Sequence, residues 1–218
     1  MHNIGLALVA VPFLVMLVVV INHQGKEAFI SRLALTAILL MCALTLVATG
    51  STLIHGPTLV SYGDIYHGSH YDFPLALFID YKSLVFLWIT NGIGLVIIRF
   101  SRNYLHREEG YGRFFATIFL FLTGLNLLSV AGSLDLFFAG WEFVGVSSFL
   151  LIGFYRRRLL PVKNSLRAFC AYRIADIGLF IGAFLSHVIF GDGLFFADIA
   201  GADESDLVAS HPGDPCAG

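Results

Sequence analysis

Six apolar segments run through the chain, and each is long enough to cross a lipid bilayer as an α-helix. They cover residues 4–21, 33–49, 83–98, 114–134, 136–155 and 168–190. A helix needs about 17–25 mostly apolar residues to cross a hydrocarbon layer of about 30 Å. Charged residues make up only 13% of the chain, whereas a soluble domain contains about 25%. The sequence therefore predicts an all-α, polytopic membrane protein with six transmembrane helices within residues 1–190.

The basic residues lie on one side of the predicted helices. Eleven of the 13 Lys and Arg residues fall in or beside the first, third and fifth connections. The opposite side, including the C-terminal stretch, carries mainly Asp and Glu. Because Lys and Arg are retained on the cytoplasmic side of a membrane, we expect both termini to lie outside the cytoplasm. In a bacterial inner membrane this side is the periplasm.

Two longer stretches lie on the outer side. Residues 50–81 form an outer loop rich in Gly, Tyr, His and Asp, with room for a short hairpin. His55, His67 and His70 lie in this loop, but a metal site needs several convergent ligands at short range. A solvated loop is therefore the better interpretation. Residues 191–218 are acidic and rich in Gly, Pro and Ala, which predicts a flexible C-terminal tail.

The fifth apolar segment contains a single carboxylate. Glu142 lies inside the run LFFAGWEFVGVSSFLLIGF at residues 136–154, and no other charge lies between Asp135 and Arg156. An ionised side chain in hydrocarbon costs about 2.5–3.5 kcal/mol on insertion scales. Glu142 must therefore face protein or water, or be held protonated. Either state suits a group that exchanges protons with a pathway.

The sixth apolar segment contains a pair of opposite charges. Arg173 and Asp176 are three residues apart, so they share a helix face. Counted from residue 168, Arg173 lies about 8 Å and Asp176 about 12 Å from the cytoplasmic end of the sixth segment. Glu142, in the fifth segment, lies about 20 Å from the same side of the membrane. We therefore expect Arg173 to pair with Asp176 and Glu142 to need another partner. The pair is compatible with a purely structural role and with a direct role in transport.

No motif of soluble-enzyme chemistry is present. The chain lacks GxxxxGK[ST], GxGxxG, HExxH and GxSxG, and its three cysteines are too far apart for a CxxC site. We therefore expect no catalytic centre, no cofactor, no metal ion and no nucleic-acid partner. Cys42 and Cys170 fall in apolar segments, where a cysteine is usually a small buried hydrophobic residue.

Several sequence blocks resemble the antiporter-like membrane subunits of respiratory complex I, the NuoL-like family. The blocks are EEGYGRFF at 108–115, GWEFVGVSSFLLIGF at 140–154 and RAFCAYRIADIG at 167–178, and their order and spacing fit the family. The stretch at 78–84 also resembles the entrance to the family's third helix. The family includes the large subunit of Mrp-type cation/proton antiporters and DabB, the membrane subunit of inorganic-carbon pumps. The residues of this chain do not separate these three.

The resemblance implies roles for three residues. Glu142 matches the family's essential fifth-helix glutamate, and Arg173 and Asp176 match its sixth-helix arginine and aspartate. The family pairs this glutamate with a lysine on its seventh helix, whereas the 218 residues of this chain resemble only the N-terminal portion of the family fold. We therefore expect proton translocation by coupled protonation of Glu142 and a lysine from another chain. Both a natural split subunit and a truncated product fit this length.

The resemblance also implies partners. We expect other membrane subunits that supply the lysine-bearing helices, a larger hydrophilic, redox or DabA-like subunit, and the lipid bilayer. The complex would be NADH-quinone oxidoreductase-like or a DabA/DabB-type inorganic-carbon uptake pump, and the chain would at most be a membrane subunit of it. The alternative is a scaffold or assembly subunit that does not transport.

Overall fold

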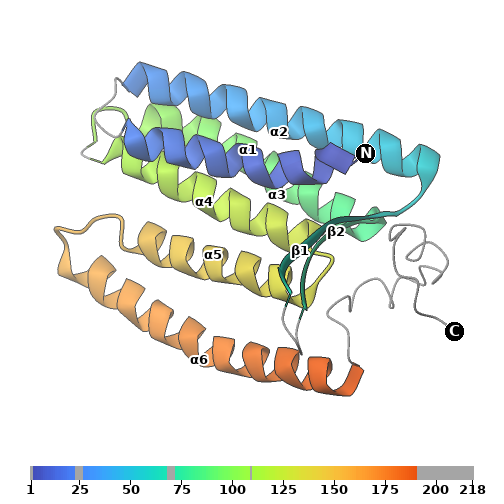
Figure 1. Cartoon of the computed structure of the whole chain (residues 1–218). Helices are drawn as coiled ribbons and strands as arrows, with labels where there is room; N and C mark the ends of the chain where they lie inside the picture. Colours follow the sequence, from blue (N-terminus) through green and yellow to red (C-terminus); the bar gives the residue numbers. More distant parts are fainter. Residues whose placement is uncertain (1, 23–26, 68–71, 109, 191–218) are drawn as a thin grey trace, which may run out of the picture.

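The computed structural model describes residues 2–22, 27–67, 72–108 and 110–190. Within these ranges the chain forms six α-helices and one β-hairpin (Figure 1). The elements are α1 (His2–Ile21), α2 (Glu27–His55), β1 (Thr58–His67), β2 (Asp72–Ile79), α3 (Tyr81–Tyr104), α4 (Tyr111–Val130), α5 (Leu134–Ile152) and α6 (Leu159–Phe190). The predicted flexible tail at 191–218 lies outside the described residues.

The six helices found within the described ranges are each long and apolar enough to cross a membrane. This confirms the predicted all-α membrane fold and its six spans. The predicted outer loop at 50–81 is shorter than expected at its start, because α2 continues to His55. The rest of the loop forms the hairpin, whose strands pair antiparallel.

The sixth helix begins earlier than hydropathy predicts. Helix α6 starts at Leu159, whereas the apolar segment begins only at residue 168. The intervening stretch contains Lys163 and Arg167, which end an apolar run but do not break a helix. Long basic side chains can extend from the end of a membrane helix to the polar region while their stems stay on apolar surface. The helical register of α6 is therefore set well before its apolar part begins.

Helix α4 lies at the centre of the molecule, and α6 lies at its edge (Figure 1). In the most apolar stretch of each helix, 61% of α4 is buried but only 6% of α6. Phe115 and Phe119 of α4 are fully buried in a cluster with side chains of α1, α2 and α3. Helix α5 packs along α4, and α6 packs mainly along α5. Among the described elements, the α5–α6 pair therefore has one face on α4 and another face that no helix covers.

The hairpin is fixed to the turn between α4 and α5. The amide of Gly132 donates a 2.9 Å hydrogen bond to the carbonyl of Ala76, and Leu77 forms a β-bridge with Ala131. A Cβ atom at Gly132 would lie 2.8 Å from the Ala76 oxygen, so only glycine allows this approach. Residues 76–79 of β2 are buried and lie against one end of α1 and α4 (Figure 1).

Two glycines bring the backbones of α4 and α5 into contact. A Cβ atom at Gly124 would lie 2.9 Å from the Gly140 oxygen, and one at Gly140 would lie 2.9 Å from the amide nitrogen of Leu128. Small residues at a membrane helix interface allow such close approach, which increases dispersion contacts. Gly145, which lies farther along α5, has no such neighbour within 4 Å. The α4–α5 contact therefore depends on Gly140 and not on Gly145.

We predict that Gly140→Ala destabilises the protein and that the matched control Gly145→Ala on the same helix does not. The added methyl group at residue 140 meets backbone atoms that cannot rotate away, and overpacking of this kind costs about 1–3 kcal/mol. Thermal unfolding of the purified chain in detergent should show a lower midpoint for Gly140→Ala alone. Equal midpoints for the two variants would contradict the close contact of α4 and α5.

Candidate functional site

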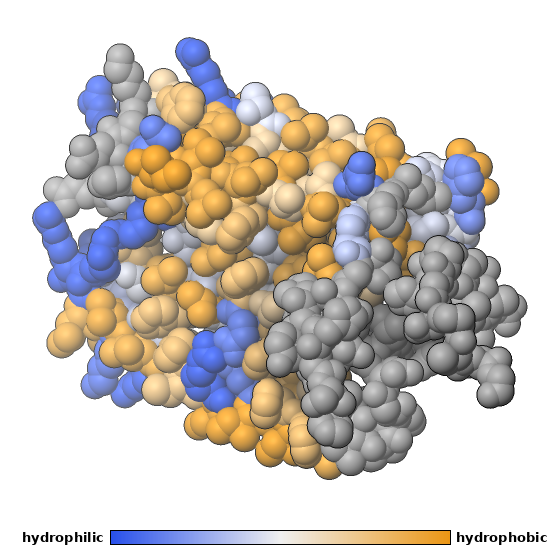
Figure 2. All heavy atoms as spheres, in the orientation of Figure 1, coloured by the Kyte–Doolittle hydropathy of each residue, from blue (hydrophilic) through white to orange (hydrophobic). Residues whose placement is uncertain are grey.

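The three residues predicted to form the site come from α5 and α6. Glu142 lies in the middle of α5, and Arg173 and Asp176 lie one turn apart in α6. Figure 2 shows a hydrophilic patch partway along the α5–α6 side of the molecule, surrounded by hydrophobic surface. The structure brings all three side chains together between the two helices.

Arg173 binds Glu142 through two parallel hydrogen bonds. Its Nη1 donates to Oε1 of Glu142 at 2.8 Å and its Nη2 donates to Oε2 at 2.6 Å. The same Nη1 lies 3.5 Å from Oδ2 of Asp176. Bidentate guanidinium–carboxylate pairs are strong and fix the orientation of both groups. Arg173 therefore bridges two carboxylates, with the closer contact to Glu142.

The predicted pairing order was wrong. From the apolar segments, Arg173 was expected about 12 Å nearer the cytoplasmic end than Glu142, with Asp176 as its first partner. Because α6 begins at Leu159, Arg173 lies about 21 Å from the start of its helix. Glu142 lies about 15 Å from the end of α5 at Ile152. The two residues are thus at similar depth, and Glu142 finds its partner within this chain.

Asp176 is held by a tryptophan that the sequence did not suggest. Trp141 Nε1 donates a 2.7 Å hydrogen bond to Oδ1 of Asp176. Trp141 precedes Glu142 directly, and consecutive helix residues point about 100° apart. Pattern analysis therefore gives no reason to place both on the α6 side. Both side chains reach α6 because they project on either side of the line along which α5 and α6 touch.

One aromatic ring lies beside the Arg173 guanidinium group. The Arg173 guanidinium lies 5.0 Å from the centre of the Phe169 ring, and Phe169 in turn contacts Phe149 of α5. A cation over an aromatic face is attracted by the negative charge of the ring face, most strongly where water is excluded. These rings restrict Arg173 to the neighbourhood of its two carboxylates.

The site is partly open to its surroundings on the uncovered face of α6. The side chains are exposed to 24% for Glu142, 42% for Arg173 and 12% for Asp176. The cluster contains two carboxyl groups and one guanidinium group, so its formal net charge is −1. Such a cluster can accept one proton or one further cation from a neighbouring group. It can also let Arg173 move between its two carboxylate partners.

Two other sequence predictions have mixed outcomes. Cys42 is partly buried, and its thiol lies 3.8 Å from the backbone oxygen of Asn91. Cys170 is exposed, so the prediction of a buried residue was wrong for it. The reason is that α6 packs against protein on one face only. Among the outer-loop histidines, His55 is exposed and bonds the backbone of its own helix through Ser51. His70 lies outside the described residues.

Two separate parts of the chain match known families. Residues 66–115 match the family described as NADH-Ubiquinone oxidoreductase (complex I), chain 5 N-terminus. Residues 131–207 match the family described as NADH:quinone oxidoreductase/Mrp antiporter, TM. The second match contains Glu142, Arg173 and Asp176.

The chain is also similar to curated proteins that are named NADH-quinone oxidoreductase subunit L. It is 40% identical over 120 residues to the protein of Buchnera aphidicola subsp. Schizaphis graminum. This match covers 55% of this chain and 20% of the Buchnera protein. It is 35% identical over 145 residues to the Mycobacterium tuberculosis protein, covering 65% and 23%. The Escherichia coli (strain K12) protein is 38% identical over 109 residues, covering 50% and 18%. The chain thus matches about a fifth of the length of these relatives.

A solved structure has the same arrangement of helices. It is described as the structure of the membrane-bound sulfane sulfur reductase (MBS), an archaeal respiratory membrane complex. The match has a TM-score of 0.74 at 16% identity and covers 87% of this chain and 38% of the other. At this identity the likeness concerns the fold. The two family matches and the curated relatives show that residues 66–115 and 131–207 are similar to the N-terminal portion of NuoL-like, antiporter-type membrane subunits.

Proposed function

We propose that this chain is the carboxylate-bearing part of a proton-translocating membrane subunit, in a complex of the NADH-quinone oxidoreductase type. The observation that carries the proposal is the cluster of two carboxylates around one guanidinium between two membrane helices. The names of the relatives support this type of complex over an inorganic-carbon pump. Chemistry at a redox centre would belong to other subunits.

The proposed proton carrier is Glu142. A carboxylate that accepts two hydrogen bonds from a guanidinium is held in its ionised form, so it must lose that partner before it takes up a proton. Arg173 already lies 3.5 Å from Asp176, and Trp141 holds Asp176 in place. Movement of Arg173 onto Asp176 would leave Glu142 free to be protonated. Return of Arg173 would expel the proton.

A cation from another chain would control this movement. The open face of α6 carries exposed apolar side chains beside the cluster, with exposures of 72% for Ile174 and 61% for Ile177. An apolar face of this kind can be covered by further membrane helices. A lysine on such a helix would neutralise the net negative charge of the cluster and compete for Glu142. Lysine-bearing helices of a partner subunit are therefore the proposed occupants of this face.

We predict that Glu142→Gln abolishes proton translocation while leaving membrane insertion intact. Glutamine keeps the size of the side chain but cannot bind and release a proton. Proton uptake should be measured in vesicles that contain the chain assembled with its partner subunits. Asp135→Asn, at the start of the same helix, is the control and should transport as the parent does. Full transport by Glu142→Gln would favour the alternative role as a scaffold subunit.

We also predict that Glu142 and Arg173 are coupled in stability. Either single substitution breaks the bidentate pair, and the second substitution then has no pair left to break. In a double-mutant cycle with Glu142→Gln and Arg173→Gln, the double variant should be more stable than additivity predicts by about 0.5–3 kcal/mol. Thermal unfolding in detergent gives the four values. A parallel cycle of Asp135→Asn with Arg173→Gln should be additive, and additivity in both cycles would show that the pair is not coupled.

The distribution of basic residues supports a bacterial inner-membrane protein with both termini in the periplasm. In a variant without native cysteines, His55→Cys should react with a membrane-impermeant thiol reagent added to intact cells that have a permeable outer membrane. Asn103→Cys, at the basic end of the molecule, should react only after the inner membrane is opened. Both positions are exposed. The reverse labelling pattern would invert the proposed orientation.

A further inference from the structure

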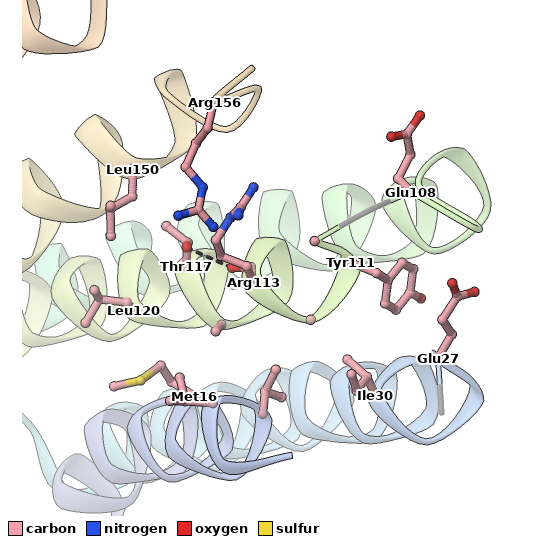
Figure 3. Close-up of a pocket in the computed structure, with 15 residues that line it drawn as sticks. Met16, Glu27, Ile30, Glu108, Tyr111, Arg113, Thr117, Leu120, Leu150 and Arg156 are labelled. Atoms are coloured by element: carbon pink, nitrogen blue, oxygen red, sulfur yellow. Dashed lines mark hydrogen bonds between the residues drawn. The ribbon is translucent and has the colours of Figure 1, made fainter. Parts of the chain in front are cut away.

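A groove of about 750 Å³ opens at the basic end of the molecule, away from the α5–α6 cluster (Figure 3). Its walls come from α1, α2, α4 and the end of α5. Because it lies where these helices begin or end, it is at the level of the membrane surface and not at mid-membrane. The groove has a charged end and an apolar wall. A ligand that fills it would need a polar portion at the charged end and an apolar portion along the wall.

Two arginines reach into the groove from different elements. Arg113 comes from the first turn of α4, and Arg156 follows the end of α5. Figure 3 shows both guanidinium groups in the same part of the groove. Arg113 is held there, because its Nη2 donates to the Phe154 carbonyl at 2.9 Å and its guanidinium lies over the Phe154 ring. Two like charges at one place favour an anion between them.

The start of α4 adds to this anion site. Its N-cap is Gly110, which provides no side-chain hydrogen bond to the first amides of the helix. A Cβ atom at Gly110 would lie 3.0 Å from Nη2 of Arg113, so the guanidinium lies against the start of the helix. The N-terminus of a 20-residue helix presents free amides and a positive dipole end, both of which favour phosphate.

Two carboxylates line the same groove, so its charge is balanced and not simply positive. Glu27 already accepts a 2.8 Å contact from His106 Nδ1 and a hydrogen bond from the Arg107 amide. Among the residues that the structure describes, the Glu108 side chain forms no ion pair, and it is exposed. Two arginines and two glutamates match a ligand with a phosphate and an amine better than one with a net negative charge.

The apolar wall continues from the charged end along the helices. Met16 of α1, Leu120 of α4 and Leu150 of α5 line it. In Figure 3, Leu150 lies beside the two arginines, and Leu120 and Met16 lie below it. A free phosphate or a soluble phosphoamine would leave this wall uncovered. An acyl chain that runs parallel to the helices would cover it and gain the dispersion contacts.

We propose that this groove binds a membrane phospholipid with a primary-amine headgroup, phosphatidylethanolamine, in the leaflet at the basic end of the helices. The phosphate lies between Arg113 and Arg156 at the start of α4. The Glu108 carboxylate points away from the two arginines in Figure 3 and turns toward them to meet the ammonium group. One acyl chain lies along Met16, Leu120 and Leu150. The lipid site does not include the residues of the Glu142 cluster, so it can be tested separately from the proposed transport function.

Native mass spectrometry of the delipidated 218-residue chain in detergent tests this assignment. Phosphatidylethanolamine, phosphatidylglycerol and phosphatidylcholine with identical acyl chains are added separately and in competition. We expect phosphatidylethanolamine to bind most tightly. Glycerophosphoethanolamine, which has the same headgroup without acyl chains, should compete only at far higher concentration. Equal binding of phosphatidylethanolamine and phosphatidylglycerol, or equal binding of the headgroup alone, would overturn the proposal.

Variants identify the two ends of the headgroup. Arg156→Glu lies on an exposed residue and should weaken phosphatidylethanolamine binding at least about tenfold, since a hydrogen bond to a charged group contributes roughly that factor. Glu108→Gln should reduce the preference over phosphatidylglycerol while binding persists. Arg158→Gln, which stacks on Tyr155 and does not line the groove, is the control and should bind as the parent does. Unchanged binding by Arg156→Glu would refute the site.

Discussion

The bidentate pair between Arg173 and Glu142 largely determines how the outermost helix is held. Between membrane helices there is no hydrophobic driving force, since lipid tails are as apolar as the side chains they replace. Helix α6 has little protein around it, so its attachment to α5 depends on polar and aromatic contacts. The Arg173–Glu142 pair, the Trp141–Asp176 hydrogen bond and the contact of Phe149 with Phe169 provide them. The same groups that fix the helix are those proposed to move the proton, so a change in pairing would also change how α6 is held.

Helix α5 can hold α6 in place because the opposite face of α5 is packed tightly against α4. The Gly124–Gly140 contact brings the two backbones together only two residues from Glu142, so the carboxylate is placed by a rigid interface and not by a loop. Helix α4 is in turn surrounded by α1 and α3, and the hairpin holds the turn between α4 and α5 through Gly132 and Ala76. Within the described residues, the molecule therefore combines a well-packed part, built around α4, with an edge pair that is little covered by protein.

The two sites proposed here differ in depth and in chemistry. The cluster around Glu142 lies inside the membrane, where a charge survives only with a partner, and its open side faces outward from α6. The groove at Arg113 and Arg156 lies at the membrane surface, where phosphate, amine and acyl chain meet within one lipid. A lipid bound there would contact α1, α4 and the end of α5 together. It would thus support the packed part of the molecule without touching the titrating groups.

Hydropathy by itself determined the number of helices, because each must satisfy its backbone hydrogen bonds internally across the hydrocarbon. The isolated charge at Glu142 and the spacing of Arg173 and Asp176 likewise marked the site from sequence alone. The choice of partner did not follow, because depth was counted from the first apolar residue of the sixth segment and α6 in fact begins at Leu159. Only the tertiary structure decided that Arg173 reaches Glu142 and that Trp141 binds Asp176. Which side chains meet across two helices depends on their register and rotation, and neither is encoded in the periodicity of one helix.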